Sequence, residues 1–172
     1  MTNILRITTE FSESEDRFKL TALSEQNSTY VFWLTQRLLI KLIEHCFNWL
    51  ENKSTAPIET KKEDDFRLEA VQEFNQDSAE QELNHQDAVL PMIDSPNFVI
   101  QEIDITLGSD GIIFVFKEGC DNYRLMLNHT QLRQWLHITC KLWSKAEWPM
   151  TIWPTWISSD EHKSNEINSA IH

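Results

Sequence analysis

Glycine is scarce in this chain: its 172 residues include three glycines, Gly108, Gly111 and Gly119. Loops that bind phosphate groups use several glycines, one of them opening a helix, so that backbone N–H groups can approach the ligand. Gly108 and Gly111 instead bracket the turn-forming pair Ser109-Asp110, and Gly119 begins another turn. The sequence therefore indicates no nucleotide-binding loop, and no cofactor is expected.

Cysteine is equally rare. Cys46, Cys120 and Cys140 are odd in number and form no C-x-x-C pair, which is typical of a protein kept reduced in the cytoplasm. A zinc site needs three or four protein ligands, and the nearest candidates are the pairs His137–Cys140 and His45–Cys46. Neither pair supplies enough ligands, so we expect surface histidines and core cysteines rather than a metal site.

Recognisable catalytic groups are missing as well. Cys120 lies beside Asp121, whose negative charge disfavours the reactive thiolate. No serine stands in the spacing of a nucleophile elbow. The paired carboxylates Asp64 and Asp65 lie in a solvated acidic run, whereas general acid–base catalysis needs a buried, perturbed carboxylate. We name no catalytic residue, and the sequence favours a protein that is not an enzyme.

Positive charge and long apolar runs are also lacking. The chain has 15 Lys and Arg against 27 Asp and Glu, a net charge of −12. This excess disfavours binding to nucleic acid and to anionic membranes. The most apolar stretch, residues 30–50, is interrupted by charged residues, and the N-terminus lacks a signal-peptide pattern. We expect a cytoplasmic protein without nucleic-acid or membrane partners.

What the chain does contain is a clear strand-to-helix unit at residues 121–143. Tyr123, Leu125 and Leu127 occupy alternate positions, as in a strand with one face on a core, and Asn128 then offers a helix N-cap. The apolar residues that follow recur at steps of three and four on one helical face: Leu132, Trp135, Leu136, Cys140 and Trp143. The other face is predicted to carry most of the polar residues: Arg133, Gln134, His137 and Lys141.

The same plan occurs earlier, at residues 28–50. Tyr30 aligns with Tyr123 at an offset of 93 positions, and the cap former Thr35 then falls on Asn128. Each unit follows a hairpin-like pattern, which predicts an internal repeat of three strands and a helix. The alternative is that any two amphipathic strand–helix units align this well.

We therefore predict an α+β domain: an antiparallel sheet or β-sandwich of about six strands with two long helices. An acidic insertion separates the halves, with twelve acidic and four basic residues between Glu51 and Pro96. A loop is predicted from Lys53 to Asp65, then a surface helix with a thin apolar stripe from Phe66 to about Leu90. The alternative is a partly disordered insertion.

The predicted single domain covers residues 1–157 and ends in a segment rich in Trp and Pro. Its parts are a first half at 1–51, the insertion at 52–96, a second half at 97–146 and the Trp-Pro segment at 147–157, before a polar tail at 158–172. Trp148, Trp153 and Trp156 are the candidate partner-binding residues, because Trp is enriched at binding hot spots. The alternative is that this segment folds back over the protein's own core, the commoner use of large aromatic side chains.

The stretch from Ile103 to Leu127, especially Ser109–Phe116 leading into Tyr123–Leu125, carries a resemblance in the order of its elements. The chain resembles the head domains shared by DNA-end-joining scaffold proteins and the centriolar cartwheel protein. The resemblance implies assembly through heads rather than catalysis, and no functional residue carries over. The chain departs from that family where it turns at Pro149 instead of continuing into a coiled-coil stalk.

Together these features favour a non-enzymatic protein-interaction or assembly protein, with a protein partner or with itself as a homodimer. One alternative is an enzyme or small-ligand binder with a pocket between helices and sheet, lined by Tyr30, Tyr123 and Trp135. Another is an acidic decoy that mimics nucleic acid and binds a basic partner in a salt-sensitive manner.

Overall fold

Strands followed by a helix occur in both halves of the chain, as the sequence pattern predicts, and a further helix lies in the insertion between them. The computed structural model describes residues 1–54, 62–83 and 86–157. The elements are β1 (Thr2–Ser12), β2 (Arg17–Ser24), β3 (Thr29–Leu34), α1 (Gln36–Ser54), α2 (Lys62–Gln81), β4 (Asn97–Val99), β5 (Glu102–Leu107), β6 (Gly111–Glu118), β7 (Asp121–Asn128), α3 (His129–Lys145) and the 3-10 helix η1 (Met150–Ile152). The tail predicted at 158–172 and most of the predicted loop, residues 55–61, lie outside the described residues.

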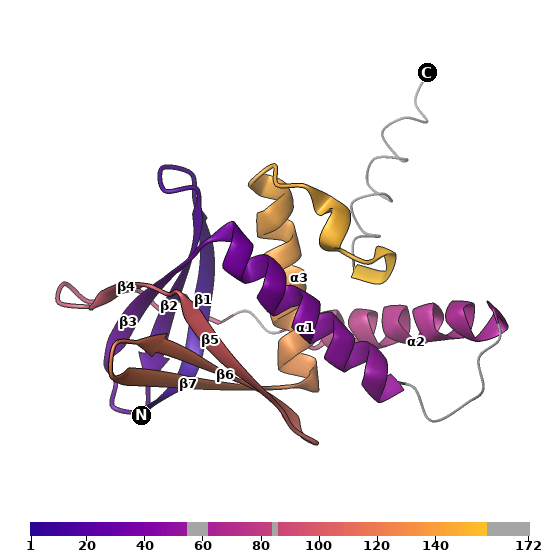
Figure 1. Cartoon of the computed structure of the whole chain (residues 1–172), viewed down its shortest axis with the longest axis horizontal. Coiled ribbons are helices and arrows are strands. Elements are labelled where there is room, and N and C mark those ends of the chain that lie inside the picture. Colours follow the sequence, from indigo (N-terminus) through magenta and orange to yellow (C-terminus); the bar gives the residue numbers. More distant parts are fainter. Residues whose placement is uncertain (55–61, 84–85, 158–172) are drawn as a thin grey trace.

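The protein is α+β, and its seven strands form one mixed sheet in the order β4-β3-β2-β1-β7-β6-β5, curved into a half-barrel (Figure 1). The two meanders, β1–β3 and β5–β7, are antiparallel. The prediction of a wholly antiparallel sheet of about six strands is wrong in two places, because β1 pairs parallel with β7 and β3 pairs parallel with β4. Hydrophobic alternation indicates which face of a strand is buried, but it carries no information on the direction of the neighbouring strand.

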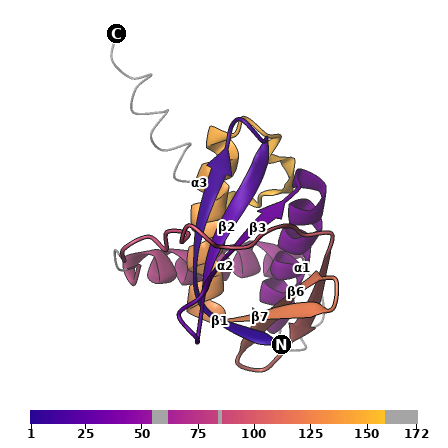
Figure 2. The same cartoon turned by 90° about the vertical axis from the view of Figure 1, so that its left-hand side faces the viewer.

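A single stretch of chain links the two edges of this sheet. β4 and β5 stand at opposite ends of the strand order, yet only Ile100 and Gln101 separate them. Ile100 is buried and its N–H donates to the main-chain oxygen of Trp33 at 3.0 Å, so the chain follows β3 before it pairs with β6. Residues 97–107 thereby form both edge strands of the sheet, with β4 beside β3 and β5 beside β6 (Figure 2).

The two meanders have similar registers that differ by one residue. Phe18 lies opposite Leu34 in the first, and Ile112 lies opposite Leu127 in the second. α1 begins at Gln36 and α3 at His129, which is the offset of 93 found in the sequence. The helix starts therefore match the offset of 93, whereas the partner of Leu127 is one residue away from the position that this offset gives, and the internal repeat stays a prediction.

Aromatic rings from both halves fill the interior. The rings of Tyr30 and Tyr123, the aligned pair, have centroids 4.8 Å apart, and Phe32 stacks on Phe116 at 5.0 Å. Phe98 of β4 joins this cluster, with its ring 5.7 Å from that of Tyr123. Stacked and tilted ring pairs add to the apolar burial, so the two halves share one hydrophobic interior.

α1 and α3 cover one side of the sheet, and both are capped as predicted (Figure 1). Thr35 Oγ1 accepts a hydrogen bond from the N–H of Leu38 at 3.3 Å. Asn128 and Gln131 form a reciprocal capping box, with distances of 2.9 and 3.0 Å, which satisfies two free N–H groups at the start of α3. The fully buried apolar residues of the two helices include Leu39, Ile43 and Leu50 on α1 and Leu132, Leu136 and Trp143 on α3.

The Trp-Pro segment folds back on the chain's own core. Trp148, Trp153 and Trp156 are 8%, 7% and 6% exposed. Trp148 and Trp153 pack edge-on against Trp143, with centroids 4.8 and 5.8 Å away, and Trp156 packs edge-on against Phe47 at 5.5 Å. The segment thus has the folded-back arrangement that was the alternative to a free docking peptide.

Candidate functional site

Helix α2 lies at the end of the molecule away from most of the sheet (Figure 1). A helix within the acidic insertion was predicted, but α2 begins inside the predicted loop, at Lys62, and ends at Gln81 instead of about Leu90. Residues 86–90 have no regular structure, and the N–H of Val89 is tied to β1 through a 2.7 Å hydrogen bond to Thr8 Oγ1. No Gly or Pro stands between Gln81 and Leu90, so the sequence lacks the strongest stop signals near the observed end.

α2 turns polar rather than apolar residues toward the rest of the protein. Gln72 and Gln76 are 2% and 1% exposed, and Ala79 follows them on the same buried face. They meet the polar face of α3, where Arg133 and His137 are 5% and 7% exposed. The expectation of surface histidines is therefore wrong for His137, because α2 covers the face of α3 that carries it.

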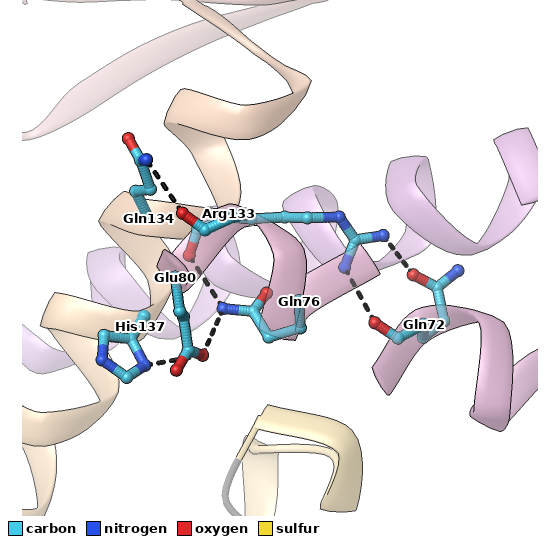
Figure 3. A network of polar contacts seen from close by, with 7 residues as sticks. Gln72, Gln76, Glu80, Arg133, Gln134 and His137 are labelled. Carbon is cyan, nitrogen blue, oxygen red and sulfur yellow. Dashed lines mark hydrogen bonds and ion pairs between the residues drawn. The ribbon is translucent and has the colours of Figure 1, made fainter. Parts of the chain in front are cut away.

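Hydrogen bonds join these two polar faces (Figure 3). Gln76 Nε2 donates to the main-chain oxygen of Arg133 at 3.2 Å and to Glu80 Oε1 at 2.9 Å. Glu80 Oε1 also lies 2.8 Å from His137 Nδ1. Gln134 Nε2 donates to the main-chain oxygen of the buried Ala79 at 2.9 Å. Directional polar contacts therefore position α2 on α3.

Arg133 is the most unusual member of this network. Its guanidinium donates to the main-chain oxygen of Gln72 at 3.4 Å and to Gln72 Oε1, and its Cζ lies 5.4 Å from the ring centroid of Trp156. Within the described part of the chain, no carboxylate forms an ion pair with it. Burial away from water lowers the pKa of Arg133 to about 10. A buried charge bonded to neutral acceptors costs free energy, so this interface fixes the position of α2 more than it stabilises the fold.

The opposite face of α2 is apolar and open to solvent. Phe66 and Phe74 are 76% and 72% exposed, Val71 is 46% exposed, and Ala70 is exposed as well. Residues four apart are neighbours on a helix surface, so Phe66, Ala70 and Phe74 form a line with Val71 beside it. We call these four residues the α2 stripe. An ordinary surface helix buries its apolar stripe and exposes its polar face, and α2 does the reverse.

A row of carboxylates runs beside the α2 stripe. Glu69, Glu73 and Asp77 follow one another at steps of four residues, and Glu69 accepts a hydrogen bond from Thr155 Oγ1. The whole helix has seven acidic and two basic residues. The α2 stripe therefore lies in a negative field, which favours a positively charged neighbour.

The candidate metal ligands have other surroundings in the structure. His137 pairs with Glu80, while Cys140 packs in the core. Cys46 is buried, which raises the pKa of its thiol, and the neighbouring His45 is exposed. Over the residues that the structure describes, no group of three or more His, Cys, Asp or Glu could hold a metal ion.

The predicted pocket-lining residues are Tyr30, Tyr123 and Trp135. The two tyrosines contact each other inside the half-barrel. Trp135 instead lines a groove of about 540 Å³ between β1, β7, α3 and residues 82–83 and 86–88. Its Nε1 donates to Thr9 Oγ1 at 3.1 Å, so both polar groups are already engaged with each other.

The candidate partner-binding residues Trp148, Trp153 and Trp156 lie in the core, and a partner could reach them only if this segment left it. The α2 stripe was not predicted as a binding surface. Its residues were visible as a thin apolar stripe, but nothing in their spacing indicated that they would face solvent.

No protein-family model matches the chain, and no curated protein or solved structure matches it. No helix in the described residues is long and apolar enough to cross a membrane.

Proposed function

We propose that this chain is a non-enzymatic protein-interaction protein and that the α2 stripe is its partner-binding surface. The observation that carries the proposal is the reversed orientation of α2, with Gln72 and Gln76 buried and Phe66 and Phe74 exposed. Contiguous exposed apolar surface on a soluble protein is typical of an interaction site. Aromatic side chains are among the residues that contribute most to binding energy.

The two exposed Phe side chains would contribute a substantial part of the free energy of binding. Burying one exposed Phe side chain contributes roughly 1.5–3 kcal/mol. Phe66 and Phe74 together would contribute about twice that on a partner, before Val71 is counted. In the isolated chain both rings are exposed and contribute little to stability. The opposite side of α2 is the one that contacts α3, and it does so through polar groups.

Two further expectations from the sequence belong to the same proposal. The resemblance to head domains supports assembly rather than catalysis. The two antiparallel meanders and the matching starts of the helices that follow them support a structural repeat of three strands and a helix. Both fit a compact, cytoplasmic scaffold that presents α2 to another protein, with self-association as one form of that role.

Photocrosslinking in the full chain tests the proposal. Benzoylphenylalanine is placed at position 74 in the cells that produce the protein, and at the exposed position Glu15, in the turn before β2, as a control. We expect discrete protein adducts from position 74 and none of these from position 15. An excess of unmodified chain should compete for the adducts, whereas the Phe66→Asp chain should not.

The result that would overturn the proposal is equally specific. If position 74 yields no adduct beyond those of position 15, or if the Phe66→Asp chain competes as well as the unmodified chain, the α2 stripe is not a binding surface. An adduct between two copies of this chain would identify the partner as a second copy and would leave the interaction role intact.

A further inference from the structure

We infer that the partner received by the α2 stripe is a basic amphipathic helix. This inference rests on the proposed function and adds the chemistry of the partner. Its basis is the pairing of an exposed apolar line, Phe66 to Phe74, with the carboxylate row formed by Glu69, Glu73 and Asp77.

The spacing along α2 suits a helix better than an extended strand. Phe66 and Phe74 stand eight residues apart, about 12 Å along the axis at 1.5 Å per residue. Between them Ala70 has a small side chain, which allows a second helix backbone to approach closely. A partner helix with apolar side chains at steps of three and four would place them on either side of Ala70, in the way helices recognise apolar helix faces.

The charges beside the stripe specify the sign of the partner. Glu73 and Asp77 form no ion pair within the described residues, and they lie one helical turn apart along the edge of the stripe. Lys or Arg side chains at the flanking positions of a partner helix would face them at the rim of the interface. Such rim charges raise the association rate and select the partner more than they add affinity.

The same charges disfavour a second copy as the occupant. Two α2 helices placed face to face would bring together seven acidic and two basic residues from each, on chains that each have a net charge of −12. Like charges juxtaposed across an interface cost free energy. The chain's own last residues, 158–172, are also unsuitable by composition, since they contain three acidic residues and one basic residue.

A peptide titration tests the inference. The probes are fluorescein-labelled synthetic peptides: a Leu/Lys peptide with leucines on one helical face, a scrambled peptide of the same composition, a Leu/Glu peptide with the same leucine face, and a Lys/Ala helix without leucine. Each is titrated with the full-length chain, and binding is followed by fluorescence anisotropy at low and at physiological salt.

We expect the Leu/Lys peptide to bind at least about tenfold more tightly than the other three probes. The Phe66→Asp/Phe74→Asp chain should lose at least about tenfold in affinity, whereas Ile93→Asp, at an exposed apolar residue outside the α2 stripe, should not. The Glu73→Gln/Asp77→Gln chain should bind about threefold more weakly and with less salt dependence. Glu13→Gln/Glu15→Gln, which changes the net charge equally, should bind as the unmodified chain does.

Three outcomes would overturn the inference. Equal binding of the Leu/Lys and Lys/Ala probes would mean that charge alone acts, as in a nucleic-acid decoy. Equal binding of the Leu/Lys and Leu/Glu probes would remove the role of the carboxylate row. Sedimentation showing a dimer that Phe66→Asp/Phe74→Asp dissociates would make a second copy the occupant. If the peptide titration fails while position 74 still crosslinks to a protein, only the partner chemistry is wrong; if both fail, the proposed function fails too.

Discussion

Helices α2 and α3 lie against each other, but they are held in the protein by opposite kinds of contact. α3 buries Leu132, Leu136 and Trp143 against the sheet, and hydrophobic burial dominates its stability. α2 buries Gln72 and Gln76 against the polar face of α3 and leaves its phenylalanines in solvent. The difference indicates that hydrogen bonding can place a helix while its apolar face stays available for another molecule.

This comparison also separates stability from recognition. Apolar burial is non-directional and strong, whereas a hydrogen-bonded interface contributes little net free energy but permits only one geometry. We therefore expect substitutions on α3 to unfold the protein, substitutions between α3 and α2 to loosen α2, and substitutions on the α2 stripe to change binding alone.

The largest effect is expected in the core of α3. Trp143 is fully buried and contacts Phe18, Trp148 and Trp153. Trp143→Ala should lower the free energy of unfolding by about 3–5 kcal/mol, measured by urea denaturation. Phe74→Ala, the matched aromatic substitution on α2, should change it by less than about 0.5 kcal/mol. Similar losses for the two variants would contradict the proposed difference between the helices.

An intermediate effect is expected where the two helices meet. Arg133→Ala removes both hydrogen bonds to Gln72 and leaves buried acceptors without donors, which should cost about 2 kcal/mol. Arg133→Met keeps the aliphatic packing and relieves the buried charge, so it should cost about half as much. Hydrogen exchange measured by mass spectrometry should show faster exchange of α2 amides in the Ala variant, with β2 and β6 unchanged. Uniformly faster exchange across the sheet would contradict this account.

The pH dependence of stability sharpens the same comparison. Because desolvation lowers the pKa of Arg133 to about 10 in the folded state, the cost of the buried charge is fully present below that pH. As the pH rises through 10 toward the ordinary value of 12.5, the folded protein releases this proton before the unfolded chain does. The unmodified chain should therefore gain about 1 kcal/mol relative to Arg133→Met between about pH 9 and 11.

The quantity of interest is the difference in free energy of unfolding between the two chains. The contributions of lysines and tyrosines, which both chains share, cancel in this difference. Urea denaturation of both chains at each pH provides it. A constant difference across this range would mean that Arg133 keeps its ordinary pKa and is better solvated than its burial indicates.

The smallest effect on stability is expected on the α2 stripe. Phe66→Asp/Phe74→Asp removes no buried contact, so the melting temperature should change by less than about 2 °C. Differential scanning calorimetry measures it, with Phe18→Ala as a buried control that should lower the melting temperature strongly. A large drop for the double variant would mean that the two rings pack within this chain.

The sequence predicted the parts of the fold in which hydrophobic pattern and structure agree. Alternation at Tyr123, Leu125 and Leu127 and the capping residues Thr35 and Asn128 were sufficient to place β7, α1 and α3. The parallel pairings of β1 with β7 and β3 with β4 were not predictable in this way, because they join segments far apart in the chain. They depend on how the whole sheet closes around its interior.

The candidate site escaped prediction for a different reason. A period-3.6 pattern identifies an apolar face and assigns it to the core, and at α2 that assignment is reversed. The burial of the polar face of α3 was not predicted for the same reason. Arg133 and His137 belong to the polar side by pattern, yet α2 covers them. The contact between the two polar faces explains both the exposed apolar face of α2 and the buried polar face of α3. A single sequence does not reveal which helix faces meet.

Hydroxyl-radical footprinting of the isolated chain, at a concentration where it sediments as a monomer, tests the reversed orientation of α2 most directly. Mass spectrometry compares the oxidation rates of Phe66 and Phe74 with those of the fully buried Phe18 and Phe32. The account predicts rapid oxidation at positions 66 and 74 and strong protection at 18 and 32. Protection of Phe66 and Phe74 to the level of Phe18 would contradict it, because both rings would then lie in the core and not on a surface open to a partner.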